Sequence, residues 1–350
     1  MKFKVFSKIR FFFLIYSVMI FSACHDSDKI EPEYGERTVL IYMAADNNLN
    51  KDGETNIKSI LKGMEQTAGR LVIYIDPRYD VPRLLTVKGG KGCRLDTLET
   101  YTEENSASPE GLARVVKEVQ KRYPASSYGL VLWSHGLGWV PPEYSFPGGY
   151  AMRLPDPDMP RTKYYAEDEH PGTTGKAYMD IREMAARLPG HFNFILWDVC
   201  FMGGIEVAYE LRNKTDYMIA SPAEVISDGF PYEKIVPLFW GGEEAMKQIC
   251  REYYNHYNKY PVNSLWRSAV VGLVKTEELE PLAAKVRTLL AGKTDYARAW
   301  HYPLNQGGLP MVFFDFGDYI RKMTTEEEYN SFKKLLDRVV IYKAATEKLF

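Results

Sequence analysis

The sequence has few cysteines and no strong charge of either sign. Four of its 350 residues are cysteine, and none of them form a Cys-x-x-Cys pair, so thioredoxin-like redox chemistry is not expected. The formal net charge is -2, and basic residues do not gather into stripes, which excludes the usual electrostatic signature of a nucleic-acid partner. A hydrophobic content of 45% is enough for one large core or two smaller ones.

The N-terminus lacks an apolar run long enough to span a bilayer comfortably. Basic residues precede the short apolar run 11–21, which predicts a signal peptide over residues 1–23. Phe21-Ser22-Ala23-Cys24 resembles the lipobox of bacterial lipoproteins, with Phe where Leu is usual. We therefore expect an exported lipoprotein, anchored through Cys24 to a membrane of the bacterial cell envelope or surface and followed by a polar tether over 24–37. Ordinary signal-peptidase cleavage and a retained anchor are the alternatives.

Apolar runs of strand length alternate with helical patterns between residues 38 and 240. The patterns predict strands at 38–44, 71–75, 130–134, 194–200 and 217–221, and helices at 50–67, 109–122, 180–188 and 204–213. Ser108 and Pro109 fit the N-cap and first position of the second helix. This alternation predicts an α/β fold with a mostly parallel central sheet flanked by helices. The segment 138–176, rich in proline and glycine, is expected to be a loop.

The pattern changes after residue 240. Helices are expected at 243–259, 277–291 and 325–349, with strand-like pieces at 268–273 and 311–315. This predicts a helix-rich α+β extension over 241–350, either a small subdomain or a set of elements packed on the α/β part at 38–240.

Two of the predicted strands end in reactive side chains. The run 130–134 leads into His135, and the run 194–199 leads into Cys200. If the two strands are parallel neighbours, both side chains lie at the carboxyl edge of the sheet, where open α/β folds place their ligands. A thiol beside an imidazole can act as a nucleophile, and the backbone N–H groups of Gly136 and Cys200 are candidates for the oxyanion hole. Separately, each residue could be structural: a buried small cysteine or a core histidine.

The spacing argues against an α/β-hydrolase. The nucleophile elbow of that fold needs glycine two residues before the nucleophile, where this chain has Asp198. Its catalytic histidine also comes last in the chain, whereas His135 precedes Cys200 by 65 residues (200 minus 135). That order and approximate separation are typical of caspase-like sequences.

Four stretches of the chain resemble the clostripain family of cysteine peptidases, within the wider caspase, legumain and gingipain group. They are TVLIYMAADNN at 38–48, YPASSYGLVLWSHGLGW at 123–139, DVCFMGGIEVAYEL at 198–211 and ASPAEVISDGFPY at 220–232. The resemblance implies a caspase-like fold, a catalytic dyad of His135 and Cys200, and cleavage after basic residues. It does not imply a required cofactor or a metal in the site, although some relatives use calcium.

Cleavage after arginine or lysine requires an acidic group in the substrate pocket. Asp198 and Asp228 are the candidates, with a capping role and a plain turn position as their alternatives. Family members are often made as zymogens, so self-processing in the 138–176 loop is a hypothesis, a solvated loop being the alternative. The basic residues at which the loop could be cleaved are Arg153, Arg161, Lys163 and Lys176. The same loop has an acidic cluster that is the candidate for binding calcium: Glu167, Asp168 and Glu169, with His170.

The sequence therefore predicts a secreted or lipid-anchored cysteine endopeptidase that acts on proteins or peptides after Arg or Lys. Two alternatives stay open: a catalytically silent binding protein on the same scaffold, and a cysteine hydrolase or transpeptidase with a non-basic substrate. Spacing does not decide whether Cys93 and Cys250 pair.

Overall fold

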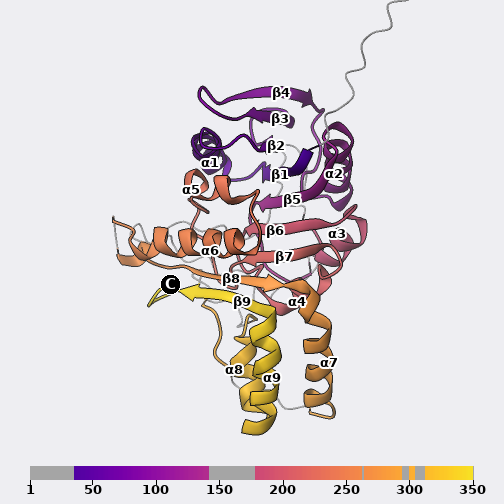
Figure 1. Cartoon of the computed structure of the whole chain (residues 1–350), viewed down its shortest axis with the longest axis vertical. Helices are drawn as coiled ribbons and strands as arrows, with labels where there is room; N and C mark the ends of the chain where they lie inside the picture. The colour runs from indigo at the N-terminus through magenta and orange to yellow at the C-terminus, as the bar shows by residue number, and fades with distance from the viewer. Residues whose placement is uncertain (1–34, 142–177, 262–263, 294–298, 304–311, 350) are drawn as a thin grey trace, which may run out of the picture. The chain divides into compact units, whose positions relative to one another are not determined.

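One mixed sheet runs through the described part of the chain (Figure 1). The computed structural model describes residues 35–141, 178–261, 264–293, 299–303 and 312–349. Within these residues the sheet has nine strands in the order β4-β3-β2-β1-β5-β6-β7-β8-β9. Its five central strands are parallel: β2 (Arg70–Pro77), β1 (Gly35–Ala45), β5 (Ala125–Trp133), β6 (Phe192–Asp198) and β7 (Thr215–Ala220).

The central strands form where successive residues are apolar, so that both faces of each strand are apolar. Every residue of β1 from Thr38 to Ala45 is buried, and β5 and β6 end in similar buried runs. Strands of a parallel sheet are covered on both faces and therefore read as continuous apolar runs rather than as alternating ones. The five strands predicted from such runs are all confirmed.

Antiparallel strands complete the sheet at both ends. The hairpin of β3 (Arg83–Lys88) and β4 (Arg94–Thr100) follows β2. It was not predicted, because residues 94–100 are polar and only half-buried. At the other end, β8 (Val270–Lys275) pairs with β7, and β9 (Val340–Ala345) pairs with β8. The segment after residue 240 thus contributes strands to the same sheet as the segment before it.

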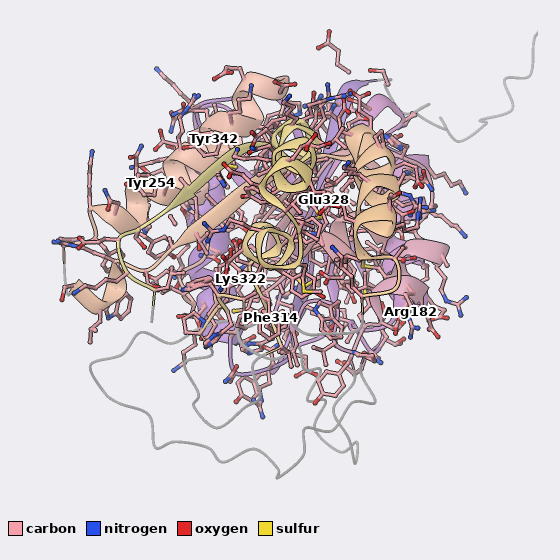
Figure 2. The ribbon with its side chains drawn as sticks, turned by 90° about the horizontal axis from the view of Figure 1, so that it is seen from below. Arg182, Tyr254, Phe314, Lys322, Glu328 and Tyr342 are labelled. Atoms are coloured by element: carbon pink, nitrogen blue, oxygen red, sulfur yellow. The ribbon has the colours of Figure 1, made fainter. Side chains whose placement is uncertain are left out.

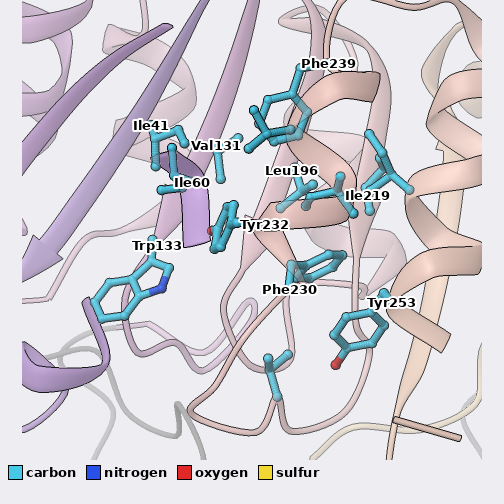
Figure 3. Packing of buried hydrophobic residues seen from close by; sticks show 14 of the residues in the cluster. Ile41, Ile60, Val131, Trp133, Leu196, Ile219, Phe230, Tyr232, Phe239 and Tyr253 are labelled. Atoms are coloured by element: carbon cyan, nitrogen blue, oxygen red, sulfur yellow. The ribbon is translucent and has the colours of Figure 1, made fainter. Parts of the chain in front are cut away.

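Helices cover both faces of the sheet, and the sheet separates two hydrophobic cores. The first face, called the α6 face below, packs against α1 (Asn50–Met64), α5 (Tyr232–Ile235) and α6 (Glu243–Asn258). Figure 3 shows its core around Ile60, Tyr232 and Tyr253. The second, the α2 face, packs against α2 (Pro109–Arg122), α3 (Ile181–Arg187), α4 (Ile205–Glu210), α7 (Leu279–Leu290), α8 (Phe316–Met323) and α9 (Glu326–Val339).

Side-chain caps fix two of the helix starts near the site. The Ser108 hydroxyl accepts a hydrogen bond from the Gly111 N–H at 2.8 Å, and Pro109 occupies the first position of α2. Asp180 accepts from the backbone N–H groups of Arg182 and Glu183 at the start of α3. Such caps satisfy N–H groups that the helix itself leaves unpaired.

The prediction for the C-terminal segment needs two corrections. The helix expected over 325–349 is wrong beyond Val339, because the β-branched and aromatic residues that follow join β8 as strand β9. The strand-like piece at 311–315 contributes only an isolated bridge between His301 and Phe314 among the residues described there.

Several predictions fall on residues outside the described ranges. These are the signal peptide at 1–23, Cys24, the tether up to residue 34, the four basic residues proposed for processing, and the acidic cluster at 167–170. No helix in the described ranges is long and apolar enough to cross a membrane. Within the same ranges, no group of three or more His, Cys, Asp or Glu side chains is placed to hold a metal ion.

Candidate active site

Residues 135 and 200 lie at the same edge of the sheet. Strands β5 and β6 pair in parallel from Gly129 with Phe194 to Trp133 with Asp198. His135 and Cys200 each follow two residues after this last pair, so both belong to the turns that leave the carboxyl ends of neighbouring strands. The predicted adjacency of the two strands is confirmed.

The imidazole of His135 is held by a residue that was not predicted. Its Nε2 atom lies 2.6 Å from Oδ1 of Asn48, and the ring is 6% exposed. Asn48 follows β1, the strand on the other side of β5. The Ser134 hydroxyl also donates to the Ala44 carbonyl at 2.9 Å, which ties the two strand ends together. A polar residue just after a buried strand, at the same carboxyl edge as the reactive side chains, was the available signal.

The thiol of Cys200 faces the segment that follows β7. Its residue is fully buried, the Val225 N–H donates to Sγ at 3.0 Å, and the thiol lies 3.6 Å from the Val225 carbonyl. The next residue, Phe201, has a φ of +60°, a conformation that residues other than glycine rarely adopt. Its N–H donates to the Ala223 carbonyl at 3.0 Å.

The two turns touch through glycines. A Cβ on Gly136 would lie 2.2 Å from Val199 Cγ1 and 3.1 Å from the Cys200 carbonyl oxygen. Gly138 has a φ of +57°, and a Cβ there would lie 2.7 Å from the Phe201 carbonyl oxygen. Only glycine allows this approach. The two backbone N–H groups predicted for the oxyanion hole, of residues 136 and 200, therefore belong to adjoining turns.

A side chain from the C-terminal segment packs on both turns. Phe313 stacks on Phe201 with ring centroids 4.4 Å apart and meets Trp139 edge-on at 6.4 Å. Phe201 is fully buried and Phe313 is 6% exposed. The next residue, Phe314, which Figure 2 labels, is 45% exposed. The contact joins the residue after the cysteine to a part of the chain more than a hundred residues away.

Asp198 is the last residue of β6, two residues before Cys200, and its side chain lies on the α6 face. It is fully buried, and its Oδ2 atom accepts from the Tyr232 hydroxyl at 2.8 Å and from the Phe230 N–H at 3.4 Å. Burial and the neighbouring Asp198 together raise the pKa of Tyr232 well above its usual value, so the phenol remains a neutral donor to the carboxylate. Figure 3 shows Tyr232 and Phe230 among the buried side chains of this face.

Asp228 lies on the same loop, two residues before Phe230. Its Oδ2 atom accepts from the Tyr260 hydroxyl at 2.8 Å, and its carbonyl accepts from the Asn56 side chain at 2.9 Å. Burial and Asp228 raise the pKa of Tyr260 to about 12. The structure thus brings the loop that carries Asp228 into contact with Asp198, while a tyrosine hydroxyl holds each carboxylate.

The described cysteines Cys93, Cys200 and Cys250 are all free thiols. The open question of a Cys93–Cys250 disulfide is thereby answered for this structure: the two are not joined. Burial raises the pKa of the Cys250 thiol far above its usual range, which makes it an inert thiol of the α6-face core.

Comparison with known protein families identifies the family of this chain. The model of the clostripain family, Peptidase C11, matches residues 41–348. The chain belongs to the clostripain family. Clostripain from Hathewaya histolytica is 25% identical over 228 residues, which cover 57% of this chain. The match covers 41% of that protein, so the chain spans about two fifths of this curated relative's length.

Two solved structures of clostripain-family proteins share the fold. An inactive zymogen of a C11 protease from Parabacteroides distasonis is 35% identical, with a TM-score of 0.74, covering 91% of this chain and 86% of that one. A secreted C11 cysteine protease from Bacteroides thetaiotaomicron, in complex with an irreversible peptide inhibitor, is 29% identical with the same TM-score, covering 89% and 85%. These matches confirm the predicted family and the caspase-like α/β fold.

Proposed function

We propose that this protein is a cysteine endopeptidase that cleaves after Arg or Lys with a dyad of Cys200 and His135. The observation that carries the proposal is the placement of both residues two positions past the paired ends of β5 and β6, on turns that touch through Gly136. Membership in a family of cysteine peptidases supports the same reading.

The residues present account for each bond change. His135 takes the proton of the Cys200 thiol, and the thiolate adds to the scissile carbonyl carbon. The N–H groups of Gly136 and Cys200 stabilise the oxyanion. The C–N bond then breaks, and His135 donates a proton to the departing amine. Water hydrolyses the resulting thioester, which releases the acid and restores the thiol. The hydrogen bond to Asn48 engages Nε2, so Nδ1 is the ring atom assigned to proton exchange.

Asp198 and Asp228 are proposed to bind the basic side chain before the scissile bond. Both lie on the α6 face, Asp198 two residues before Cys200 and Asp228 on the segment whose Val225 contacts the Cys200 sulfur, and both are already oriented by tyrosine hydroxyls. A buried carboxylate that meets a substrate cation forms a charge-assisted hydrogen bond worth about 1.5–3 kcal/mol, enough to select Arg or Lys over a neutral residue.

We further propose that the enzyme is made as a zymogen and cleaves itself between residues 138 and 176. Cys200 is fully buried in this structure, with Val225 against its sulfur, so a substrate can reach it only after the residues around it, Val225 among them, move. The likeness to a C11 protease solved as an inactive zymogen supports this step.

Export and lipid anchoring at Cys24 complete the proposal. The fold's likeness to a secreted C11 protease supports export. A clickable fatty acid fed to expressing bacteria should label the wild-type chain and not Cys24→Ser. Equal labelling of both would overturn the anchor and leave the peptidase assignment in place.

The deciding experiment compares the full wild-type chain with Cys200→Ala and, as a matched control, Cys250→Ala. Each is assayed with fluorogenic Arg, Lys, Asn and Asp peptides and run on a denaturing gel. Hydrolysis of Arg or Lys peptides, together with fragmentation, should vanish in Cys200→Ala and persist in Cys250→Ala, whose thiol is equally buried. If the wild type is inert, trypsin nicking within 138–176 should activate it. Continued inertness after nicking would favour a silent binding protein, and cleavage of neutral peptides alone would favour a different cysteine hydrolase.

A further inference from the structure

An apolar cavity opens beside His135 on the face of the sheet opposite Asp198. Its volume is about 110 Å³, well below the roughly 300 Å³ at which pockets for whole small-molecule ligands begin. His135 and Gly136 form one wall. The remaining lining includes Tyr42, Leu132, Met184, Trp197, Val199 and Met202, which all belong to the α2-face core.

One residue that lines the cavity carries a buried donor. Trp197 is 5% exposed, and among the described residues its indole N–H has no hydrogen-bond acceptor. Leaving such a group unsatisfied costs about 1–3 kcal/mol. An occupant that brings an acceptor, such as the thioether sulfur of Met, would offset part of this cost.

The position of the cavity identifies what it binds. A general acid must lie within hydrogen-bond reach of the atom that it protonates. In the proposed reaction His135 protonates the amine of the residue that follows the scissile bond. That residue therefore lies against the imidazole, and the imidazole lines the cavity.

The geometry of an extended peptide leads to the same place. Successive side chains of an extended chain point to opposite sides. If the basic side chain before the scissile bond points to Asp198 on the α6 face, the next side chain points to the α2 face. The cavity opens on that face at the same edge of the sheet as His135.

From this we infer that the cavity is the specificity pocket for the residue after the scissile bond and that it takes a large apolar side chain such as Leu or Met. The inference rests on the proposed peptidase function and adds a second selected position to it. The methionine and tryptophan side chains of the lining exclude charged side chains, whose burial without a partner is costly, while glycine leaves the cavity empty.

The test uses internally quenched peptides that are identical except for the residue after Arg, which is Leu, Met, Phe, Gly or Asp. Full-chain enzyme, nicked with trypsin if it is inert as made, should cleave the Leu and Met peptides with kcat/KM at least about tenfold above the Gly peptide. The Asp peptide should be the slowest. Rates equal within about twofold across the series would overturn the pocket and leave the peptidase assignment intact. Failure to cleave any peptide after Arg would instead overturn the proposed function.

A pair of variants locates the preference in the cavity. Met184→Ala enlarges the cavity and should shift the optimum from Leu toward Phe by about fivefold or more. Met218→Ala is the control, because Met218 is equally buried on the same face but does not line the cavity; its order of preference should match the wild type. Should Met184→Ala not fold, Ile181→Ala provides the same test from a half-buried lining position. An unchanged order in the folded cavity variant would overturn the assignment.

Discussion

The two faces of the sheet differ at the edge where His135 and Cys200 meet. On the α6 face, the carboxylates of Asp198 and Asp228 are each held by a tyrosine hydroxyl. On the α2 face, the same edge has an apolar cavity lined in part by Trp197, whose indole N–H has no acceptor among the described residues. The difference suggests that one scissile bond is recognised from both sides by opposite chemistry: charge before it and apolar contact after it.

The largest expected effect comes from removing the charge on the α6 face. Asp198→Asn keeps an acceptor for Tyr232 but loses the negative charge, so kcat/KM for Arg peptides should fall about hundredfold. The ratio between Leu and Gly after the scissile bond should not change, because the cavity lies on the other face. The comparison between the faces would fail if that ratio changed together with the loss of Arg preference.

Tyr232→Phe serves as the milder control for this change. It removes one of the hydrogen bonds to Asp198 and leaves the carboxylate in place, so its loss of kcat/KM should be smaller than that of Asp198→Asn. Circular dichroism of both proteins separates loss of the pocket from loss of the fold.

A smaller effect on activity is expected from changes at Asn48, which orients His135 at the edge where the α6 and α2 faces meet. Asn48→Ala removes the acceptor that orients His135, so kcat should fall about tenfold while KM for the same peptide changes little. Asn48→Asp retains an oxygen at that place and should recover most of the rate. If the alanine variant raised KM instead, Asn48 would be a substrate contact and not a positioning residue.

The smallest expected effect is on the pH dependence of thermal stability, which should differ between a variant on the α6 face and one on the α2 face. Burial, aided by Lys234 and opposed by Asp228, lowers the pKa of His256, whose ring packs on Tyr257 and Tyr260. The unfolded chain therefore takes up this proton at a higher pH than the folded chain does. The stability that neutral His256 contributes is present above its unfolded pKa of about 6.5 and is lost as pH falls below it.

The measurement is thermal unfolding of the wild type and His256→Phe at pH 7.5 and 5.5. The phenylalanine keeps a ring against the two tyrosines and does not titrate. Its Tm should therefore fall less on acidification than that of the wild type, by on the order of 1 °C. Met184→Ala, on the apolar face, should lower Tm by the same amount at both pH values. An equal acid response of wild type and His256→Phe would contradict this account.

Features that depend on local composition were predictable, and features that depend on distant contacts were not. The apolar runs ending at Trp133 and Asp198 predicted both strands and their reactive ends, and Ser108-Pro109 predicted the start of α2. The β3–β4 hairpin was missed because its second strand is polar at the sheet edge. The strand β9 was missed because a helical pattern runs directly into it, and only pairing with β8 decides its conformation.

The same distinction holds within the site. His135, Cys200 and Asp198 stand in recognisable sequence motifs, and the roles assigned to them stay predictions until the variants above are measured. The contacts of Asn48, Tyr232 and Phe313 were not predicted, because each residue acts on a segment dozens to more than a hundred residues away. Such contacts become visible only when the chain is folded.

The stacking of Phe313 on Phe201 has a practical consequence for anyone who shortens this protein. A chain ended at residue 240 would keep every residue of the proposed dyad and of the proposed acidic pocket, yet Phe201 would lose the ring that stacks on it. Strand β7 would also lose its partner β8 and present a bare hydrophobic edge, a template for pairing between molecules. A minimal catalytic fragment designed from the motifs alone should therefore form insoluble aggregates, and a usable enzyme must retain its C-terminal strands.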